Sequence, residues 1–287
     1  MNQTFLTNAQ ARNGNFVFFF NDDPIGACLK HYGDWAQQEL DLFDKFLTET
    51  SNVIDVGANI GTHSVYFSKK CFKGNVIAIE PQIYINQILN ANLLLNNCFN
   101  VIPYRVACGS SNGQARMINL NPFVNNKVNY GEFKVNDKAD AGFYTDIIKI
   151  DSLLKLNIVF DLLKIDVEGM EVEVISGASK LIKKHKPKIY LEFNSVNGND
   201  ELIDVLESLG YINYWHVYTK HDPNNFNKTD HNVWEPKNYE CNEKTLEKRY
   251  EGNILSVHSS QQQPLGFEVV EKGDTIVNFL KRHQLIP

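Results

Sequence analysis

The chain has 287 residues, of which 43% are hydrophobic and 22% are charged, a composition that excludes long-range disorder, collagen and coiled coil. The formal net charge of −6 leaves no basic footprint for a nucleic-acid backbone, so no nucleic-acid partner is expected. The sequence shows neither a signal peptide nor an apolar run of the roughly 20 residues that a membrane helix needs. Its five cysteines are widely spaced, without a CxxC pair. These features predict a cytoplasmic protein with reduced thiols and no membrane span.

Residues 1–51 precede the first expected strand and form an N-terminal cap segment, with an apolar run at residues 16–20 and a helix expected over 35–48. From residue 52 onward, short apolar runs alternate with stretches whose apolar residues have helical spacing. The runs predict strands at residues 52–56, 75–79, 100–106, 160–167, 188–193, 211–218 and 253–258. The stretches predict helices at residues 62–70, 83–97, 171–184 and 200–209. This alternation predicts an α/β domain over residues 52–259 with a mostly parallel sheet.

Two long segments interrupt the alternation. Residues 107–156 are too long for one crossover, and their alternating pieces at 116–120, 132–135 and 146–150 predict an inserted antiparallel β hairpin or meander. Residues 219–252 are polar and aromatic and predict a long structured loop. After the last strand, residues 260–287 are expected to form a linker and a C-terminal helix over 274–283.

A glycine turn follows directly on the first predicted strand, in the sequence Asp-Val-Gly-Ala-Asn-Ile-Gly of residues 55–61. Gly57 and Gly61 let the backbone approach a ligand without a Cβ in the way, and the next helix offers its N-terminal N–H groups. Glu80, at the end of the second strand, can accept hydrogen bonds from both hydroxyls of a ribose. Together the turn and the acid predict a nucleoside-cofactor site. The alternative is a mere tight turn, with Glu80 capping the next helix.

The spacing of the turn indicates which cofactor it holds. A dinucleotide-binding G-x-G-x-x-G fingerprint would require glycine at Asn59 and Thr62, so the sequence departs from it twice. The spacing D-x-G-x-N-x-G is instead similar to that of class I S-adenosylmethionine-dependent methyltransferases. Two other interpretations stay open, a dinucleotide-dependent oxidoreductase and a non-catalytic carbohydrate-binding protein on the same fold.

Four blocks of sequence closely resemble the FkbM-type methyltransferase family: residues 53–67 (VIDVGANIGTHSVYF), 78–82 (AIEPQ), 162–178 (LLKIDVEGMEVEVISGA) and 188–193 (KIYLEF). The tripeptide GDW at residues 33–35 and Glu39 resemble that family as well. The resemblance implies a Rossmann-like class I methyltransferase fold with strand order 3-2-1-4-5-7-6 and an antiparallel seventh strand. It implies S-adenosylmethionine as the cofactor and methyl transfer to a hydroxyl, and the expected acceptor is a glycan or an activated sugar. The expected cofactor-binding residues are Asp55, Gly57, Asn59, Gly61, Glu80 and Ala107.

Three residues near the expected carboxyl edge of the sheet are candidates for catalysis: Asp166, Glu192 and His216. A carboxylate at the end of an apolar strand is costly to bury unless it is paired, which favours a function for Asp166 and Glu192. A hydroxyl needs a base, a metal or strong positioning to attack a methyl group. We therefore expect these two residues to be base and orienting group, or ligands of a divalent cation. His216 is a further candidate base, unless it only packs among aromatic side chains, and His63 either contacts substrate or packs.

The loop at residues 219–252 is expected to be the acceptor-side lid, because the sixth strand delivers it at the carboxyl edge of the sheet. Trp234, Phe226 and Tyr239 offer flat faces to a sugar ring, or else anchor the loop by packing against the sheet. The histidines of the loop, His221 and His231, match no zinc spacing, so no metal ligands are assigned. The sequence indicates no oligomeric state.

Overall fold

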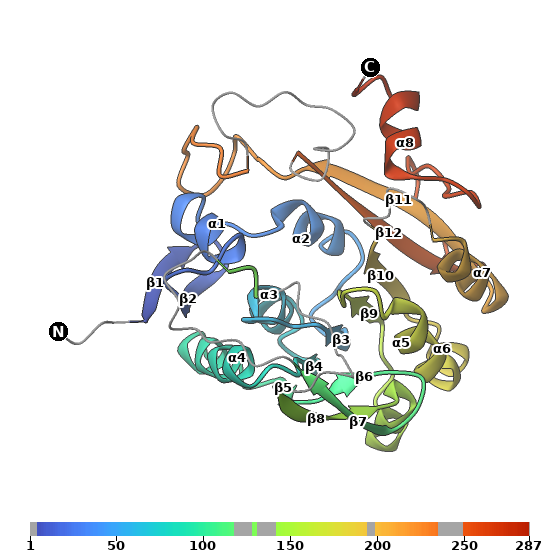
Figure 1. Cartoon of the computed structure of the whole chain (residues 1–287). Coiled ribbons are helices and arrows are strands. Elements are labelled where there is room, and N and C mark those ends of the chain that lie inside the picture. Colours follow the sequence, from blue (N-terminus) through green and yellow to red (C-terminus); the bar gives the residue numbers. More distant parts are fainter. Residues whose placement is uncertain (1–4, 118–127, 131–141, 194–198, 235–248, 287) are drawn as a thin grey trace.

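The computed structural model describes residues 5–117, 128–130, 142–193, 199–234 and 249–286. At its centre is a sheet of seven strands (Figure 1). In spatial order they are β5 (Val101–Tyr104), β4 (Val76–Ile79), β3 (Val53–Val56), β9 (Leu162–Ile165), β10 (Lys188–Glu192), β12 (Tyr250–His258) and β11 (Tyr211–Thr219). β12 runs antiparallel to both neighbours, and every other neighbouring pair is parallel. The order and the directions confirm the predicted topology.

Helices cover both faces of the sheet and bury two separate apolar clusters. One cluster joins the sheet to α2 (Gln37–Phe43), α3 (Thr62–Lys70) and α4 (Ile83–Leu95), and we call this side the α3 face. The other cluster joins the sheet to α5 (Glu171–Gly177), α6 (Ser179–His185), α7 (Asp200–Ser208) and α8 (Ile276–Arg282), and we call this side the α5 face. Within the described residues, no helix is both long and apolar enough to span a bilayer.

The two faces differ because successive residues of a strand point to opposite sides. On the α5 face, the middle of the sheet is apolar and fully buried, as at Ile54 and Ile165. On the α3 face, the same strands carry Asp55, Lys164 and Tyr190. The strand registers pair Asp55 with Lys164 and Lys164 with Tyr190, so these three residues form a polar row across β3, β9 and β10.

Residues before the sheet form a hairpin and two short helices. β1 (Leu6–Ala11) and β2 (Gly14–Phe19) pair antiparallel and are followed by α1 (Ile25–His31) and α2; the hairpin lies beside α1 and α4 (Figure 1). The apolar run at residues 16–20 is the second strand of this hairpin, and its polar first strand and α1 are not predicted by the sequence. The helix predicted over 35–48 is shorter, because it begins only after Ala36, which has φ +49.

The insertion predicted after the third strand forms a small second sheet. Its strands are β6 (Ala107–Cys108), β8 (Phe143–Ile148) and β7 (Gly113–Met117), and η1 (Ile150–Leu156) is a 3-10 helix that leads back to the central sheet. β7 and β8 pair antiparallel, which confirms the inserted hairpin, and β6 adds a short parallel strand. The strand expected at residues 132–135 lies outside the described residues.

The single helix predicted over residues 171–184 is wrong, because the structure has two helices there. Ala178, between α5 and α6, has φ −103 and ψ 1, which departs from helical geometry. Gly177 packs against the insertion so closely that a Cβ on it would lie 2.0 Å from the carbonyl oxygen of Gly109. The helical periodicity of the sequence continues across this break, and for that reason the sequence does not predict the break.

Candidate active site

A cavity of about 810 Å³ opens at the carboxyl edge of the sheet. Its lining includes the turn after β3, the residues that follow β4 and β9, the end of β10, and parts of two outer segments, residues 24–39 and 218–234. The strand order reverses between β3 and β9, since β4 and β5 lie on one side of this point and β10 on the other. Ligands of open α/β sheets bind at such a point.

The glycine turn after β3 has a backbone shape that only small residues allow. Gly57 has φ +79 and Gly61 has φ +92, and a Cβ on Gly57 would lie 1.8 Å from the carbonyl oxygen of Asp166. Asn59 also has a positive φ, +49, and its side-chain oxygen accepts the N–H of Ile60 at 2.8 Å. At Gly57, the turn thus places backbone that carries no side chain next to the end of β9, at the cavity wall.

Glu80 follows β4 and is only 4% exposed. Its Oε2 accepts the N–H of Asn59 at 3.1 Å, and its Oε1 accepts the N–H of Gln82 at 2.8 Å. Burial, reinforced by the charges of Asp166 and Asp55, raises the pKa of Glu80 to about 7 against the lowering effect of these two hydrogen bonds. The backbone therefore holds a carboxyl group at the cavity wall beside the glycine turn, where it can accept two neighbouring hydroxyls.

A smaller cavity of about 60 Å³ shares Gly57, Glu80 and Asp166 with the large one. Its other lining residues are mostly apolar and include Ala107 and Met117. An apolar slot beside a buried carboxyl group suits a flat aromatic ring. Ala107, a predicted cofactor residue, lines this slot. Met117 of β7 is a lining residue that the sequence analysis misses, because the insertion carries no motif.

Lys164 of β9 is a charged residue that the sequence analysis does not single out. It is 2% exposed, and its Nζ lies 3.0 Å from Asp166 Oδ2 and 3.7 Å from Asp55 Oδ1. Although burial acts to lower it, the charges of Asp166, Asp55 and Glu39 raise the pKa of Lys164, so the side chain stays an ammonium. Asp55 is fully buried and accepts a hydrogen bond from Ser64 Oγ at 2.6 Å. Asp55 thus supports α3 and Lys164, and it is not among the lining residues of either cavity.

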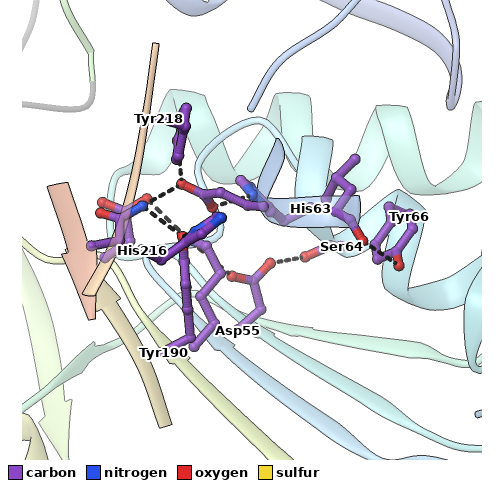
Figure 2. A network of polar contacts seen from close by, with 12 residues as sticks. Asp55, His63, Ser64, Tyr66, Tyr190, His216 and Tyr218 are labelled. Atoms are coloured by element: carbon purple, nitrogen blue, oxygen red, sulfur yellow. Dashed lines mark hydrogen bonds and ion pairs between the residues drawn. The ribbon is translucent and has the colours of Figure 1, made fainter. Parts of the chain in front are cut away.

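Glu39 of α2 lines the cavity and is the centre of a polar network, of which Figure 2 labels His63, Tyr218, Tyr190 and His216. Its Oε2 lies 2.9 Å from His63 Nε2, and its Oε1 accepts hydrogen bonds from Tyr218 Oη and Asn253 Nδ2, both at 2.7 Å. Although burial acts to raise it, the hydrogen bond and charge of His63 lower the pKa of Glu39 to about 2. These contacts tie the N-terminal segment to α3, β11 and β12.

His63 stands in the first turn of α3 and lines the cavity. Its ring lies near those of Phe43 and Phe67, with centroid distances of 6.3 and 6.1 Å. Glu39 fixes Nε2, whereas Nδ1 has no hydrogen-bond partner among the described residues. This is the arrangement of a histidine oriented by a carboxylate with its second nitrogen open. The two residues are 24 positions apart in the sequence, so no local motif predicts that they form a pair.

His216, a predicted base, is not among the residues that line the cavity. Its Nδ1 lies 2.8 Å from Tyr190 Oη, which also accepts a hydrogen bond from Asn253 Nδ2 at 2.8 Å (Figure 2). Burial lowers the pKa of His216 to about 4. The structure therefore keeps His216 one hydrogen bond away from the cavity, with Tyr190 between them.

Both predicted carboxylates, Asp166 and Glu192, line the cavity. Burial and then the charge of Asp166 raise the pKa of Glu192 well above its ordinary value. The Asp166 side chain is 45% exposed and paired with Lys164. Among the described residues, no group of three or more His, Cys, Asp or Glu side chains is arranged to hold a metal ion. The divalent-cation alternative for Asp166 and Glu192 therefore has no support in this part of the chain.

The outer wall joins the N-terminal segment to residues 219–234 of the predicted lid. Asp34 accepts hydrogen bonds from Arg12 at 2.8 and 2.9 Å and from the N–H of Phe226 at 2.6 Å. Tyr32 Oη accepts the N–H of Val233 at 2.6 Å. The described part of the loop is thereby fastened to the segment before α2.

Aromatic side chains of this wall face the cavity. Trp35 and Trp234 both line it, and their ring centroids lie 6.1 Å apart with the planes tilted by 37°. Of the three aromatic residues predicted to face a sugar, Trp234 lines the cavity, Phe226 does not, and Tyr239 lies outside the described residues. Trp35 is a further aromatic lining residue that the lid hypothesis did not include.

The strand order, the glycine turn and the buried acid after β4 together define a Rossmann-like methyltransferase fold. Comparison with known families gives the particular group: the Methyltransferase FkbM domain matches residues 55–212, more than half of the chain. The chain therefore belongs to the FkbM methyltransferase family, as the sequence blocks predict.

Two curated proteins are similar in sequence to part of this chain. Methyltransferase sdnD of Sordaria araneosa is 28% identical over 157 residues, which cover 45% of this chain and 60% of that protein. Methyltransferase 1 of Beauveria bassiana is 23% identical over 150 residues, which cover 45% of this chain and 59% of that protein. The match thus spans less than two thirds of either relative. A crystal structure of Methyltransferase FkbM from Methylobacillus flagellatus aligns with 72% of this chain and 44% of its own, at 16% identity and a TM-score of 0.43.

Proposed function

We propose that the chain is an S-adenosylmethionine-dependent O-methyltransferase whose acceptor is a hydroxyl of a sugar or glycan. The observation that carries this proposal is the position of Glu80, which lines both the apolar slot and the carboxylate-lined cavity. A nucleoside with a cationic end fits these neighbouring surfaces. Its base would lie in the slot, its ribose on Glu80, and its cationic end near Asp166 and Glu192. When bound, S-adenosylmethionine supplies a methyl group activated by a positively charged sulfur.

The proposed cofactor residues divide by role. Gly57, Asn59 and Gly61 give the cofactor an open backbone at the start of α3, where N–H groups point outward. Ala107 packs against the base in the slot. Asp55 acts from behind the turn, because it holds Ser64 of α3 and faces Lys164.

The contribution of the chain to the reaction is positioning and charge. Asp166 holds the cationic end of the cofactor in the chamber that Glu192 also lines, and Lys164 keeps Asp166 in place. The acceptor hydroxyl enters from the outer wall, so that its oxygen can approach the methyl group in line with the bond to sulfur.

We assign the removal of the hydroxyl proton to His63. A proton accepted at Nδ1 would create an imidazolium hydrogen-bonded to the carboxylate of Glu39, which stabilises the positive charge. Asp166 is a poorer base because it is paired with Lys164, and burial among carboxylates favours the protonated form of Glu192. His216 acts at most through Tyr190, as a positioning residue.

Calorimetry with S-adenosylmethionine and S-adenosylhomocysteine tests the cofactor assignment. Loss of the ribose hydrogen bonds in Glu80→Ala should weaken binding by about 2–4 kcal/mol. The matched control is Glu207→Ala on α7, an exposed carboxylate outside both cavities, which should bind as the parent does. Unchanged affinity in Glu80→Ala would remove this residue from the site.

Fluorescence titration with NADH separates the dinucleotide alternative, since tight NADH binding without binding of S-adenosylmethionine would overturn the proposal. Mass spectrometry of products, after incubation with S-adenosylmethionine and a panel of glycosides, oligosaccharides and nucleotide sugars, tests the transfer itself. A gain of one methyl group on a hydroxyl is the expected result. Cofactor binding with no methylated product across the panel would favour the non-catalytic alternative.

A further inference from the structure

The charge of the large cavity restricts the chemistry of the acceptor. Nine aspartate or glutamate side chains and only two lysines are among its described lining residues. The cofactor of the proposed function brings one positive sulfur, which offsets only part of this excess. Burial raises the pKa of Glu80 and Glu192, which favours their protonated forms, yet the charge balance of the described lining residues stays negative. An acceptor that carries phosphate would enter against this field.

Among the described residues, the two lysines that line the cavity and Arg12 at its outer wall are paired with carboxylates. Lys164 Nζ lies 3.0 Å from Asp166, and Lys220 Nζ lies 2.8 Å from Glu251. At the outer wall, Arg12 donates two hydrogen bonds to Asp34 and a third to the carbonyl oxygen of Asn224 at 3.0 Å. A diphosphate would have to break one of these pairs to gain a cation.

The outer wall instead offers what an uncharged sugar ring needs. Trp35 and Trp234 expose indole surface to the cavity, and Lys220 lies 4.8 Å from the ring centroid of Trp234, on one of its faces. The Nε1 of Trp234 and the Oδ1 of Asn253 are buried atoms without a hydrogen-bond partner among the described residues. One is a donor and the other an acceptor, so each can pair with a sugar hydroxyl, and leaving either unpaired is costly.

We propose that the acceptor subsite between the Trp35–Trp234 wall and Asn253 takes a sugar ring without phosphate, either neutral or amine-bearing, and rejects nucleotide-activated sugars. This inference rests on the proposed function and narrows its acceptor. It makes Trp234 and Asn253 binding residues for the sugar, and it makes the acidic lining the element that excludes anionic competitors.

Tryptophan fluorescence of the full chain, saturated with S-adenosylhomocysteine, tests this subsite with three probes: methyl glucoside, methyl glucosaminide and UDP-glucose. Trp215 is 2% exposed and hydrogen-bonded to Asp274, so quenching reports on Trp35 and Trp234. We expect both glycosides to bind at least tenfold more tightly than UDP-glucose. Trp234→Phe keeps an aromatic ring but removes the indole N–H, and should weaken glycoside binding several-fold, as reported by the quenching of Trp35.

Glu251→Gln is the sharper variant, because it releases Lys220 from its carboxylate and lowers the negative charge at once. UDP-glucose affinity should then rise several-fold, whereas the control Glu201→Gln, an exposed site on α7, should leave it unchanged. Binding of UDP-glucose as tight as that of the glycosides, or no quenching by either glycoside, would overturn the inference. Calorimetry with S-adenosylhomocysteine on the same sample reports the cofactor site separately, so failure of this inference and failure of the proposed function are distinguishable.

Discussion

The two faces of the central sheet are made by the same strands and have opposite chemistry. On the α5 face, Ile54 and Ile165 are wholly buried in an apolar cluster with α5, α6 and α7. One residue further along the chain, on the α3 face, stand Asp55 of β3 and Asp166 directly after β9, and Lys164 lies between their carboxylates. The α5 face therefore serves as a support for the sheet, while the α3 face carries ionised groups where β3 and β9 end.

The comparison shows how a buried charge is tolerated in this fold. An isolated ammonium in an apolar layer would lose its proton or unfold the protein. Lys164 keeps its proton because three carboxylates, on β3, after β9 and on α2, surround it. The polar row thus couples the glycine turn, the cavity floor and the N-terminal segment. A substitution at one of them should therefore affect the other two.

Removal of the central cation should have the largest effect. Lys164→Met leaves the buried Asp55 without its compensating charge, and we expect the free energy of unfolding to fall by about 3–5 kcal/mol. Urea denaturation of the whole chain measures this loss. Lys183→Met, an exposed lysine on α6, is the matched control and should change stability by no more than about 0.5 kcal/mol. Equal stability of the two variants would mean that the row does not depend on Lys164.

The histidine–carboxylate pair should affect turnover more than folding. His63→Gln keeps a donor toward Glu39 and removes the open nitrogen, so we expect kcat to fall by about 10² with the Kd of S-adenosylhomocysteine within threefold of the parent. Imidazole added to His63→Ala should restore part of the rate. His231→Gln, an exposed histidine of the loop, is the control. A loss of cofactor binding in place of turnover would show that the pair holds the cofactor and not the proton.

The sequence predicts the α5 face and the glycine turn better than the α3 face, for physical reasons. Apolar runs such as residues 52–56 and 162–165 indicate strands covered on both sides, and the glycine turn is local, so both are visible at short range. The polar row and the Glu39–His63 pair depend on strand register and on contacts across tens of residues, as between Glu39 and Asn253, which are 214 positions apart. His216 satisfied the same local criteria as a base but faces Tyr190.

Glu80 gives a pH-dependent prediction. Burial and neighbouring carboxylates raise its pKa to about 7, so the empty site holds a proton on Glu80 at pH 6 and loses it by pH 8. The ionised form is the stronger acceptor for ribose hydroxyls, so the affinity for S-adenosylhomocysteine should rise as the pH rises, by up to about tenfold between pH 6 and pH 8. Calorimetry at several pH values checks this. Glu80→Gln should bind weakly with a flat profile, and a profile as steep as that of the parent would assign the titration to another group.

The smallest effect should come from the apolar face directly behind the site. Ile54 is fully buried, and the registers set it beside Ile77 of β4 and Leu163 of β9. Ile54→Val removes one methylene from this layer and should cost about 0.5–1.5 kcal/mol of stability. The affinity for S-adenosylhomocysteine should stay within twofold, because Ile54 itself lines neither cavity. Its matched partner is Asp55→Asn, one residue away on the α3 face, which preserves shape, removes the charge that faces Lys164 and should weaken cofactor binding several-fold. If Ile54→Val weakened the cofactor as much as Asp55→Asn, the two faces would not be independent, and the apolar layer would itself set the geometry of the glycine turn.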